Sequence, residues 1–187
     1  MSKLKKYKMF IGGEWVDSDT KKTFKTLNPE NNEPWAVVPE ATAKDVDKAV
    51  KAAQKAFEGK WSNLFPRERA KYLKEIANQL RENAELLGKI ETIDTGKLFK
   101  ETKTQANYIA EYYDYYAGLA DKVEGTVLPI DKPNMQVITT RVPIGVVVAI
   151  VPWNSQMLLT AVKLAPALAM GNTIVIKSSE LAPATLF

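Results

Sequence analysis

The segment 144–151, with the sequence IGVVVAIV, is apolar at odd and even positions alike. A strand with one face in water alternates apolar and polar side chains, so this unbroken run predicts a parallel strand that helices cover on both faces. A helical pattern over residues 157–170, ending before Gly171, and a second apolar run over residues 172–177 follow it. Together these segments predict a β-α-β unit, and therefore an α/β sheet.

Four helices are predicted ahead of this unit, because apolar residues there recur at helical spacing. The first starts at the capping-box pair Thr42 and Asp45 and continues to Gly59. The others run from Pro66, from Asn83 towards Gly96, and from Glu101 to Asp121. The predicted buried stripes are Val46, Ala49, Val50, Ala53 and Phe57 in the first helix, and Ala70, Leu73, Ile76, Ala77 and Leu80 in the second.

Turn residues mark the amino-terminal region. Residues 8–18 predict a hairpin that turns at Gly12 and Gly13, since glycine tolerates the positive φ of a two-residue turn. Residues 27–34, LNPENNEP, have the composition of a loop.

A two-stranded ribbon is predicted between the helices and the parallel unit. Its strands are residues 125–130 and 135–142, separated by the turn-like DKPN. The expected organisation is a hairpin-and-helix segment at 1–121, the ribbon at 122–142, and the start of the parallel sheet at 143–187.

Composition restricts the possible chemistry. The chain has 187 residues, 45% of them hydrophobic and 26% charged, which is typical of a soluble globular protein. It contains neither cysteine nor histidine, which excludes disulfides, a Ser-His-Asp triad and the usual zinc ligands, so no metal site is expected. No apolar run reaches the roughly 18 to 20 residues of a membrane span, and there is no signal-peptide core. We therefore expect a cytoplasmic protein without a membrane partner.

Polar side chains follow the two buried strands at the point where each strand ends. Asn154 comes shortly after the first strand, and Lys177 ends the second. In open α/β sheets, ligands bind in the crevice beyond the carboxyl ends of the strands. An asparagine placed there can donate its amide N–H to an oxygen that gains negative charge during a reaction. The alternative is that Asn154 only forms a turn or caps the next helix.

Several motifs, taken in order, resemble the first part of the NAD(P)-dependent aldehyde dehydrogenases and cover nearly the whole chain. They are FIGGEWVDS, NPENNEP, DTGK, RVPIGVVVAIVPWN, KLAPALAMGNTIVIKSSE and LAP. The resemblance implies a Rossmann-like coenzyme-binding fold whose β-ribbon arm serves oligomerisation, and hence a homodimer or homotetramer. It also implies oxidation of an aldehyde to a carboxylic acid: a cysteine forms a thiohemiacetal, hydride passes to nicotinamide, and water hydrolyses the thioester.

The resemblance assigns roles to residues of this chain. Asn154 is implied to donate to the thiohemiacetal oxygen, and Lys163 matches a lysine sometimes given a proton-relay role, with a plain surface lysine as the alternative. The implied coenzyme-binding residues are Ile150, Val151, Pro152, Trp153, Lys177, Ser179 and Glu180. Because the Glu180 carboxylate would accept a hydrogen bond from a ribose hydroxyl but repel a 2′-phosphate, NAD is favoured as the coenzyme, with NADP as the alternative.

Two motifs depart from the family pattern. Many members have PWNFP where this chain has PWNSQ, so Ser155 replaces an aromatic residue and Gln156 replaces a proline. The resemblance places Ser155, Leu159 and Val162 at the substrate tunnel. The side chains of Ser155 and Val162 are smaller than the aromatic residues often found there, which predicts a wider tunnel that accepts bulky or aromatic aldehydes. The motif KSSE stands where the family has KPSE.

Family members are more than twice as long as this chain, and their later part contains the cysteine nucleophile and the glutamate general base. We therefore expect an amino-terminal fragment of such an enzyme, inactive alone. One alternative is a truncated, non-catalytic relative that binds a nucleotide or a partner.

A second alternative is a nucleic-acid-binding module built on lysines at the amino end and tyrosines in the fourth helix. The lysines are Lys3, Lys5, Lys6 and Lys8, and the tyrosines are Tyr108, Tyr112, Tyr113, Tyr115 and Tyr116. Glu111 and Asp114 interrupt the tyrosines and would repel a phosphate backbone. The sequence therefore favours packing for the tyrosines, a solvated tail for the lysines, and no nucleic-acid partner.

Overall fold

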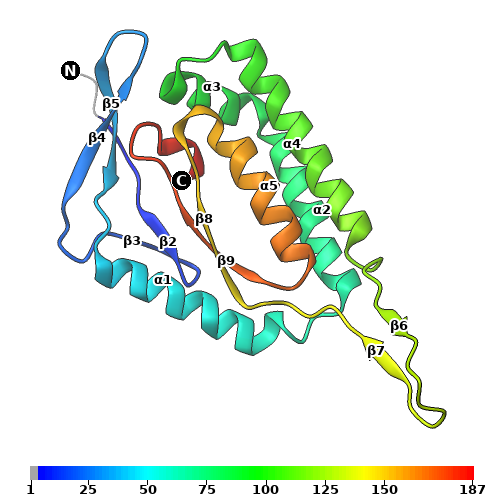
Figure 1. Ribbon diagram of the computed structural model, residues 1–187. Coiled ribbons are helices and arrows are strands. Elements are labelled where there is room, and N and C mark those ends of the chain that lie inside the picture. Colours follow the sequence, from blue (N-terminus) through cyan, green and yellow to red (C-terminus); the bar gives the residue numbers. More distant parts are fainter. Residues whose placement is uncertain (1–3) are drawn as a thin grey trace.

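The computed structural model describes residues 4–187, in which a bundle of helices packs beside a short pair of parallel strands (Figure 1). The helices are α1 (Ala43–Ala56), α2 (Pro66–Glu82), α3 (Ala84–Thr95), α4 (Phe99–Leu119) and α5 (Gln156–Ala169). The strands are β1 (Lys5–Lys6), β2 (Met9–Ile11), β3 (Glu14–Val16), β4 (Thr23–Asn28), β5 (Glu33–Pro39), β6 (Thr126–Leu128), β7 (Val137–Thr139), β8 (Val146–Ile150) and β9 (Thr173–Lys177). Short helical turns are η1 (Phe57–Trp61), η2 (Trp153–Ser155) and η3 (Ala184–Leu186).

The predicted β-α-β unit is confirmed. Strands β8 and β9 are parallel, α5 connects them, and the register runs from Val146 opposite Thr173 to Ile150 opposite Lys177. The connection leaves α5 through Gly171, whose φ of +88° is a conformation that glycine adopts without strain. In Figure 1 the strand pair lies between α1 and α5, and both helices contact it.

The prediction that helices cover both faces of β8 is confirmed only in part over residues 4–187, because α5 and α1 lie on either side of the strand pair but leave two side chains exposed. Ala149 and Val151 are buried, whereas Val148 and Ile150 are 56% and 71% exposed. The alternate side chains of a strand point to opposite faces, so Val148 and Ile150 share a face that is only partly covered. Helix α1 contacts that face near the start of the strand pair, where the Ala53 carbonyl accepts from Thr173, and leaves its far end exposed among residues 4–187.

The main hydrophobic core lies between α2, α3, α4 and α5, in agreement with the predicted helices. Leu73 and Ala77 of the predicted stripe on α2 are fully buried, and the other three residues of that stripe pack against the core. The remaining buried core residues are Ala84, Ala106, Ile109, Ala110, Tyr113, Ala117, Ala120, Met157, Ala161, Ala165 and Ala169. The many alanines let these helices approach closely, because little side-chain volume separates their backbones.

Helix α1 is held to the sheet by its second half. The Thr173 hydroxyl of β9 donates to the Ala53 carbonyl at 3.0 Å. The predicted stripe residues from Ala49 onward are half-buried, but Val46 in the first turn is 54% exposed, so the stripe is shorter than the sequence predicts.

The amino-terminal region contains more strand than the sequence predicts. The hairpin of β2 and β3 is confirmed, with Gly12 and Gly13 at φ +64° and +89°. The predicted loop at 27–34 is wrong at both ends, because β4 and β5 form an antiparallel pair and leave only residues 29–32 between them. Pro34 lies where the pairing of β5 with β4 shifts register, and such irregular positions tolerate a residue without an N–H donor.

The predicted basic tail is partly built into this small sheet. Lys5 and Lys6 form β1, parallel to β5, and Lys8 pairs with Asp17 at 3.5 Å. Lys3 lies outside the described residues. The lysine side chains remain exposed, so the backbone of this segment is ordered by the sheet while its charges face water.

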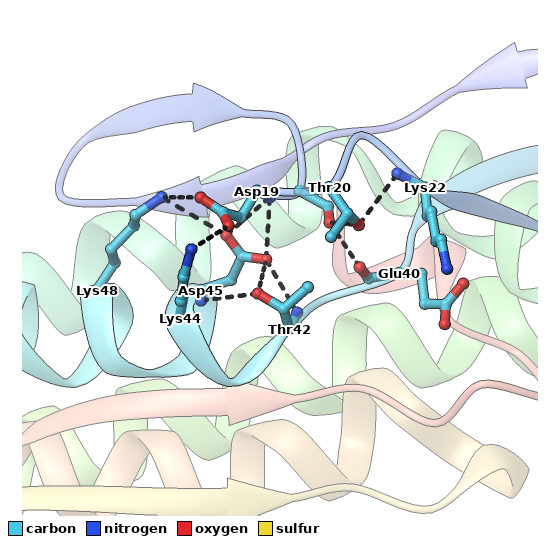
Figure 2. A network of polar contacts seen from close by, with 9 residues as sticks. Asp19, Thr20, Lys22, Glu40, Thr42, Lys44, Asp45 and Lys48 are labelled. Atoms are coloured by element: carbon cyan, nitrogen blue, oxygen red, sulfur yellow. Dashed lines mark hydrogen bonds and ion pairs between the residues drawn. The ribbon is translucent and has the colours of Figure 1, made fainter.

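A buried carboxylate fastens the start of α1 to the turn that precedes β4 (Figure 2). Asp45 completes the predicted capping box with Thr42, whose backbone N–H donates to Asp45 Oδ2 at 2.9 Å. The backbone N–H of Asp19 donates to both Asp45 oxygens at 3.1 Å. Burial raises the pKa of Asp45, but these hydrogen bonds and the nearby Lys48 ammonium outweigh it, so the net shift of the pKa is downward.

The predicted ribbon is confirmed as β6 and β7, which are antiparallel and project away from the helices (Figure 1).

The tyrosines of α4 have different environments, because they lie on different sides of that helix. Tyr113 is buried, Tyr112 and Tyr116 pack against the core, and Tyr108 and Tyr115 are more than half exposed. Between residues 4 and 187, no helix is both long enough and apolar enough to cross a bilayer.

Helices α3 and α4 touch at Gly88, where a side chain would not fit. A Cβ at Gly88 would lie 2.9 Å from both the Cα and the backbone nitrogen of Lys103. By contrast, a Cβ at Gly118 on α4 would meet no atom within 4 Å. The first glycine is therefore required by packing, and the second is not.

Substituting these two glycines tests the close contact. We expect Gly88→Ala to lower the free energy of unfolding by about 1–3 kcal/mol, because two backbones must move apart. Gly118→Ala should leave it unchanged or raise it by up to about 1 kcal/mol, because alanine is the better helix former. Urea unfolding followed by circular dichroism measures both, and equal stability of the two variants would contradict the packing argument.

Asp94 ties three distant segments together in the interior. Its Oδ1 accepts from the Thr26 hydroxyl of β4 at 3.0 Å, and its Oδ2 accepts from the Ala184 N–H of η3 at 2.6 Å. The side chain is 1% exposed. Burial raises the pKa of Asp94 from 3.8 to about 6, although these hydrogen bonds favour the ionised form.

The raised pKa predicts a pH dependence of stability. Between pH 4 and pH 6 the folded state keeps a proton on Asp94 that the unfolded state has lost, so stability from this group is present below pH 4 and is lost as the pH rises to about 6. The loss is on the order of 3 kcal/mol. Asp94→Asn should remove it while keeping the acceptor for Ala184. Urea unfolding between pH 4 and pH 7 measures the difference in free energy of unfolding between the wild type and the variant, in which the contributions of the other carboxyl groups cancel. If this difference does not change with pH, the assignment to Asp94 is refuted.

Candidate functional site

The carboxyl ends of β8 and β9 meet at one edge, as the sequence predicts. Ile150 and Lys177 are opposite each other at the ends of the two strands, and the Val151 N–H donates to the Lys177 carbonyl at 3.0 Å. The two segments that leave these strands, residues 151–155 and 178–182, therefore start side by side. Polar groups on both segments are presented at the same edge of the sheet.

Asn154 lies in η2, between β8 and α5, and its side chain is exposed. The N-cap position of α5 is Ser155, and neither Asn154 nor Ser155 makes a side-chain capping hydrogen bond. Within residues 4–187, the Asn154 amide group donates to no other residue. Asn154 therefore does not cap α5, whereas its place in η2 agrees with the turn alternative; its exposed amide N–H stays a candidate donor to a ligand.

Lys177 and Glu180 form an ion pair at this edge. The Lys177 Nζ donates to Glu180 Oε2 at 2.9 Å, and the two side chains are 58% and 68% exposed. A hydrogen bond from its own backbone N–H lowers the pKa of Glu180, and Lys177 lowers it further. The carboxylate is thus ionised at neutral pH, and beside it stands an ammonium donor. A vicinal diol needs one acceptor and one donor of this kind.

The connecting segment offers apolar surface next to these polar groups. Ile150 is 71% exposed and Trp153 is 52% exposed, and Pro152 is also at the surface. The Val151 side chain is 2% exposed, so Val151 presents only backbone to a ligand. Apolar walls with a few convergent polar groups are the usual composition of a small-molecule site.

The residues predicted for the substrate do not share one environment. Leu159 and Val162 are half-buried on α5. Ser155 is 8% exposed, and its hydroxyl accepts a hydrogen bond from the Lys97 ammonium in the loop between α3 and α4. Lys163 is exposed and donates to the Leu159 carbonyl one turn earlier, at 3.2 Å. The tunnel-facing role of Ser155 and the relay role of Lys163 stay predictions.

A buried polar layer beneath the Asn154 turn escaped the sequence analysis. Glu91 on α3 is fully buried, and its carboxylate has no hydrogen-bond partner within the described part of the chain. Burial raises the pKa of Glu91, and the nearby Lys97 ammonium offsets this only in part. The signal was available: Gly88, Glu91 and Asp94 recur at helical spacing on the buried stripe of α3, where acids are uncommon.

Gln156 and Ser179 belong to the same layer. Gln156 is fully buried at the start of α5, and its Oε1 accepts from the Ser179 backbone N–H at 3.3 Å. Ser179, predicted to bind coenzyme, is 6% exposed, and its hydroxyl accepts from the Leu181 N–H at 3.2 Å. In this structure Ser179 shapes the loop after β9, and Glu180 next to it carries the exposed charge.

Comparison with known proteins agrees with this geometry. A sequence model of the aldehyde dehydrogenase family matches residues 15–187. The chain is 48% identical over 184 residues to (Z)-2-((N-methylformamido)methylene)-5-hydroxybutyrolactone dehydrogenase from Acinetobacter baylyi, with 98% of this chain and 37% of that protein covered.

Solved structures show the same fold. A point mutant of betaine aldehyde dehydrogenase from Staphylococcus aureus, in complex with NAD+, is 39% identical with a TM-score of 0.92, and the match covers 96% of this chain and 36% of that one. A 3,6-anhydro-L-galactose dehydrogenase, solved in complex with NAP, is 31% identical with a TM-score of 0.92, covering 97% and 38%. This chain therefore spans little more than a third of the length of these relatives. On the match of its sequence and of its fold, the chain belongs to the aldehyde dehydrogenase family.

Proposed function

We propose that this chain supplies the oxyanion-stabilising and coenzyme-binding edge of an enzyme that oxidises an aldehyde to a carboxylic acid. The overall reaction is aldehyde + NAD+ + H2O to carboxylic acid + NADH + H+. The observation that carries the proposal is the exposed Asn154 amide, free of partners among residues 4–187, at the sheet edge that also presents Lys177 and Glu180. Family membership supplies the reaction class.

The role of Asn154 follows from the charge that develops in the reaction. When a nucleophile attacks the aldehyde carbon, the carbonyl oxygen gains negative charge, and an amide N–H donor stabilises it. The chain contains no cysteine, so the thiol that forms the thiohemiacetal must come from outside these 187 residues. That requirement agrees with the fraction of each relative that the chain covers.

The residues at the edge fit a nicotinamide coenzyme. The Lys177 ammonium would donate to one ribose hydroxyl and the Glu180 carboxylate would accept from the other, while Ile150 and Trp153 would provide apolar contact. When bound, the coenzyme accepts hydride from the substrate carbon. An ionised Glu180 repels the extra phosphate of NADP, so we propose NAD as the preferred coenzyme.

The remaining assignments are also proposals. Leu159 and Val162 face the aldehyde, and the small Ser155 widens its tunnel. Lys163, exposed on α5, serves as a proton relay. The ribbon of β6 and β7 joins subunits into a homodimer or homotetramer, which the 65% and 60% exposure of Val127 and Ile138 supports. The cytoplasmic location stays a prediction.

A second candidate is a non-catalytic relative that binds a nucleotide, and the absence of cysteine favours it. Measuring NAD binding and NADH production with the full-length protein distinguishes the two candidates. Binding of NAD with NADH production from an aldehyde supports the enzyme. Binding without turnover of any aldehyde supports the second candidate.

Replacing Asn154 tests the oxyanion role. We expect Asn154→Ala to reduce kcat for aldehyde oxidation by about 100- to 1,000-fold, because the donor acts on charge that exists only during the reaction. The Kd for NAD should change by less than about threefold, because the proposed coenzyme contacts remain. Asn78→Ala, on an exposed position of α2, is the matched control and should retain full activity. A kcat for N154A near that of N78A would exclude the role.

Replacing Glu180 tests the coenzyme assignment. We expect Glu180→Gln to lower kcat/KM for NAD by about tenfold, because a charged acceptor is lost from an exposed site. The value for NADP should stay the same or rise, since the repulsion of the 2′-phosphate is removed as well. Glu124→Gln, an exposed glutamate ahead of the ribbon, controls for the change in net charge. An equal decrease in kcat/KM for NAD and for NADP would show that Glu180 does not distinguish the two coenzymes at the ribose.

A further inference from the structure

The two residues that depart from the family pattern, Ser155 and Gln156, both turn into the protein. Each lies directly after Asn154, and each makes a polar contact with a different segment. Ser155 accepts from Lys97, which follows α3, and Gln156 accepts from the backbone of Ser179, which follows β9. The Asn154 turn is thus linked on one side to α3 and on the other to the Lys177–Glu180 loop.

The link through Gln156 is unusual because the side chain is fully buried. A buried amide costs free energy unless its polar atoms are paired, and a hydrocarbon of the same volume would not carry that cost. Its Oε1 accepts from the Ser179 N–H at 3.3 Å, while its Nε2 has no partner within residues 4–187. The bonded oxygen is therefore the part of the side chain that serves the structure, and its partner is loop backbone.

Ser179 stands between the two charged residues of the proposed ribose site. Its N–H is buried and points to Gln156, while its hydroxyl accepts from the Leu181 N–H at 3.2 Å. These two bonds fix the backbone on either side of Glu180. Lys177, two residues earlier, ends β9 opposite Ile150. Without the bond to Gln156, the strand would still hold Lys177, but the backbone leading to Glu180 would lose its attachment to α5.

We propose that Gln156 is a positioning residue that couples the Asn154 turn (residues 151–155) to the coenzyme loop (residues 178–182). It holds Glu180 beside Lys177 before the ribose binds. The proposal rests on the proposed function, because it concerns the affinity of that site for NAD. Gln156 touches neither coenzyme nor substrate; it acts through the Ser179 backbone. The Lys97–Ser155 contact holds the other side of the same turn, so the turn cannot follow the loop if the loop moves.

The experiment compares NAD binding and amide hydrogen exchange between the full-length wild-type protein and its variants. Gln156→Met keeps the volume and removes the acceptor, so we expect the Kd for NAD to rise about fivefold to tenfold, as for one lost buried hydrogen bond. Without NAD, amide hydrogen exchange in residues 178–181 should accelerate about tenfold, while β8 exchanges as in wild type. The KM for NAD should rise with kcat changed less than about twofold.

Thr160→Val is the matched control, one turn further along the same buried face of α5. The Thr160 hydroxyl is buried and makes no hydrogen bond to any of the described residues, including those of the loop after β9. This variant should leave both the Kd for NAD and the exchange of residues 178–181 unchanged. If Q156M does not fold, Gln156→Asn replaces it, because one methylene less draws the oxygen away from Ser179.

The outcomes separate this proposal from the proposed function. A wild-type protein that does not bind NAD would refute the proposed function. A wild type that binds NAD, with Q156M or Q156N equal to it in affinity and exchange, would refute the positioning role alone. Faster exchange throughout the protein, in β8 as much as in the loop, would also refute it, because Gln156 would then be only a core residue.

Discussion

The parallel pairing of β8 with β9 is the constraint on which the site depends. Its register places Ile150 opposite Lys177, and the Val151 N–H extends the ladder by one more bond to the Lys177 carbonyl. Parallel strands end on the same side, so the segments carrying Asn154 and Glu180 leave the sheet together. A shift of one residue would turn Lys177 to the other face and separate the two segments by a strand residue.

Carboxylates buried on α3 support this edge from below. Asp94 holds β4 and η3, and Glu91 lies near Lys97 and the first backbone N–H groups of α5. Buried acids cost free energy unless hydrogen bonds or cations compensate them, and the same burial raises the pKa of both groups. These acids lie where helices meet loops that no sheet or helix hydrogen bonds hold in place. Hydrogen bonds to a carboxylate have a preferred direction, which apolar contacts lack, so they fix the position of the loop backbone.

The polar layer and the alanine-rich core divide the work between them. The core of α2, α3, α4 and α5 brings the helices together without specifying the position of any loop atom. Hydrogen bonds that Gln156, Ser155 and Asp94 accept specify the positions of the segments around the sheet edge. Figure 1 shows the same division, with α2, α3, α4 and α5 packed together on one side of the strand pair and irregular segments at the ends of β8 and β9.

The sequence by itself determined the regular elements and the end of the parallel unit. Helical spacing, the capping box of Thr42 and Asp45, and the run at 144–151 are local patterns, and local propensity with burial is enough to produce them. The motifs around Asn154 and Lys177 also indicated the family. The strands β4 and β5 were not predicted, because the turn residues between them indicated a longer loop. Their strand structure depends on hydrogen bonds to each other, which the local sequence does not show.

Only the tertiary structure decided which side chains meet across long separations. Lys97 reaches Ser155, Asp94 reaches Ala184, and Gln156 reaches Ser179, and no spacing along the chain predicts these partners. It also decided that Val148 and Ile150 of β8 stay exposed among residues 4–187 and that Val46 faces water. The physical reason is that periodicity reports which residues avoid water, whereas partners and coverage depend on how separate elements pack.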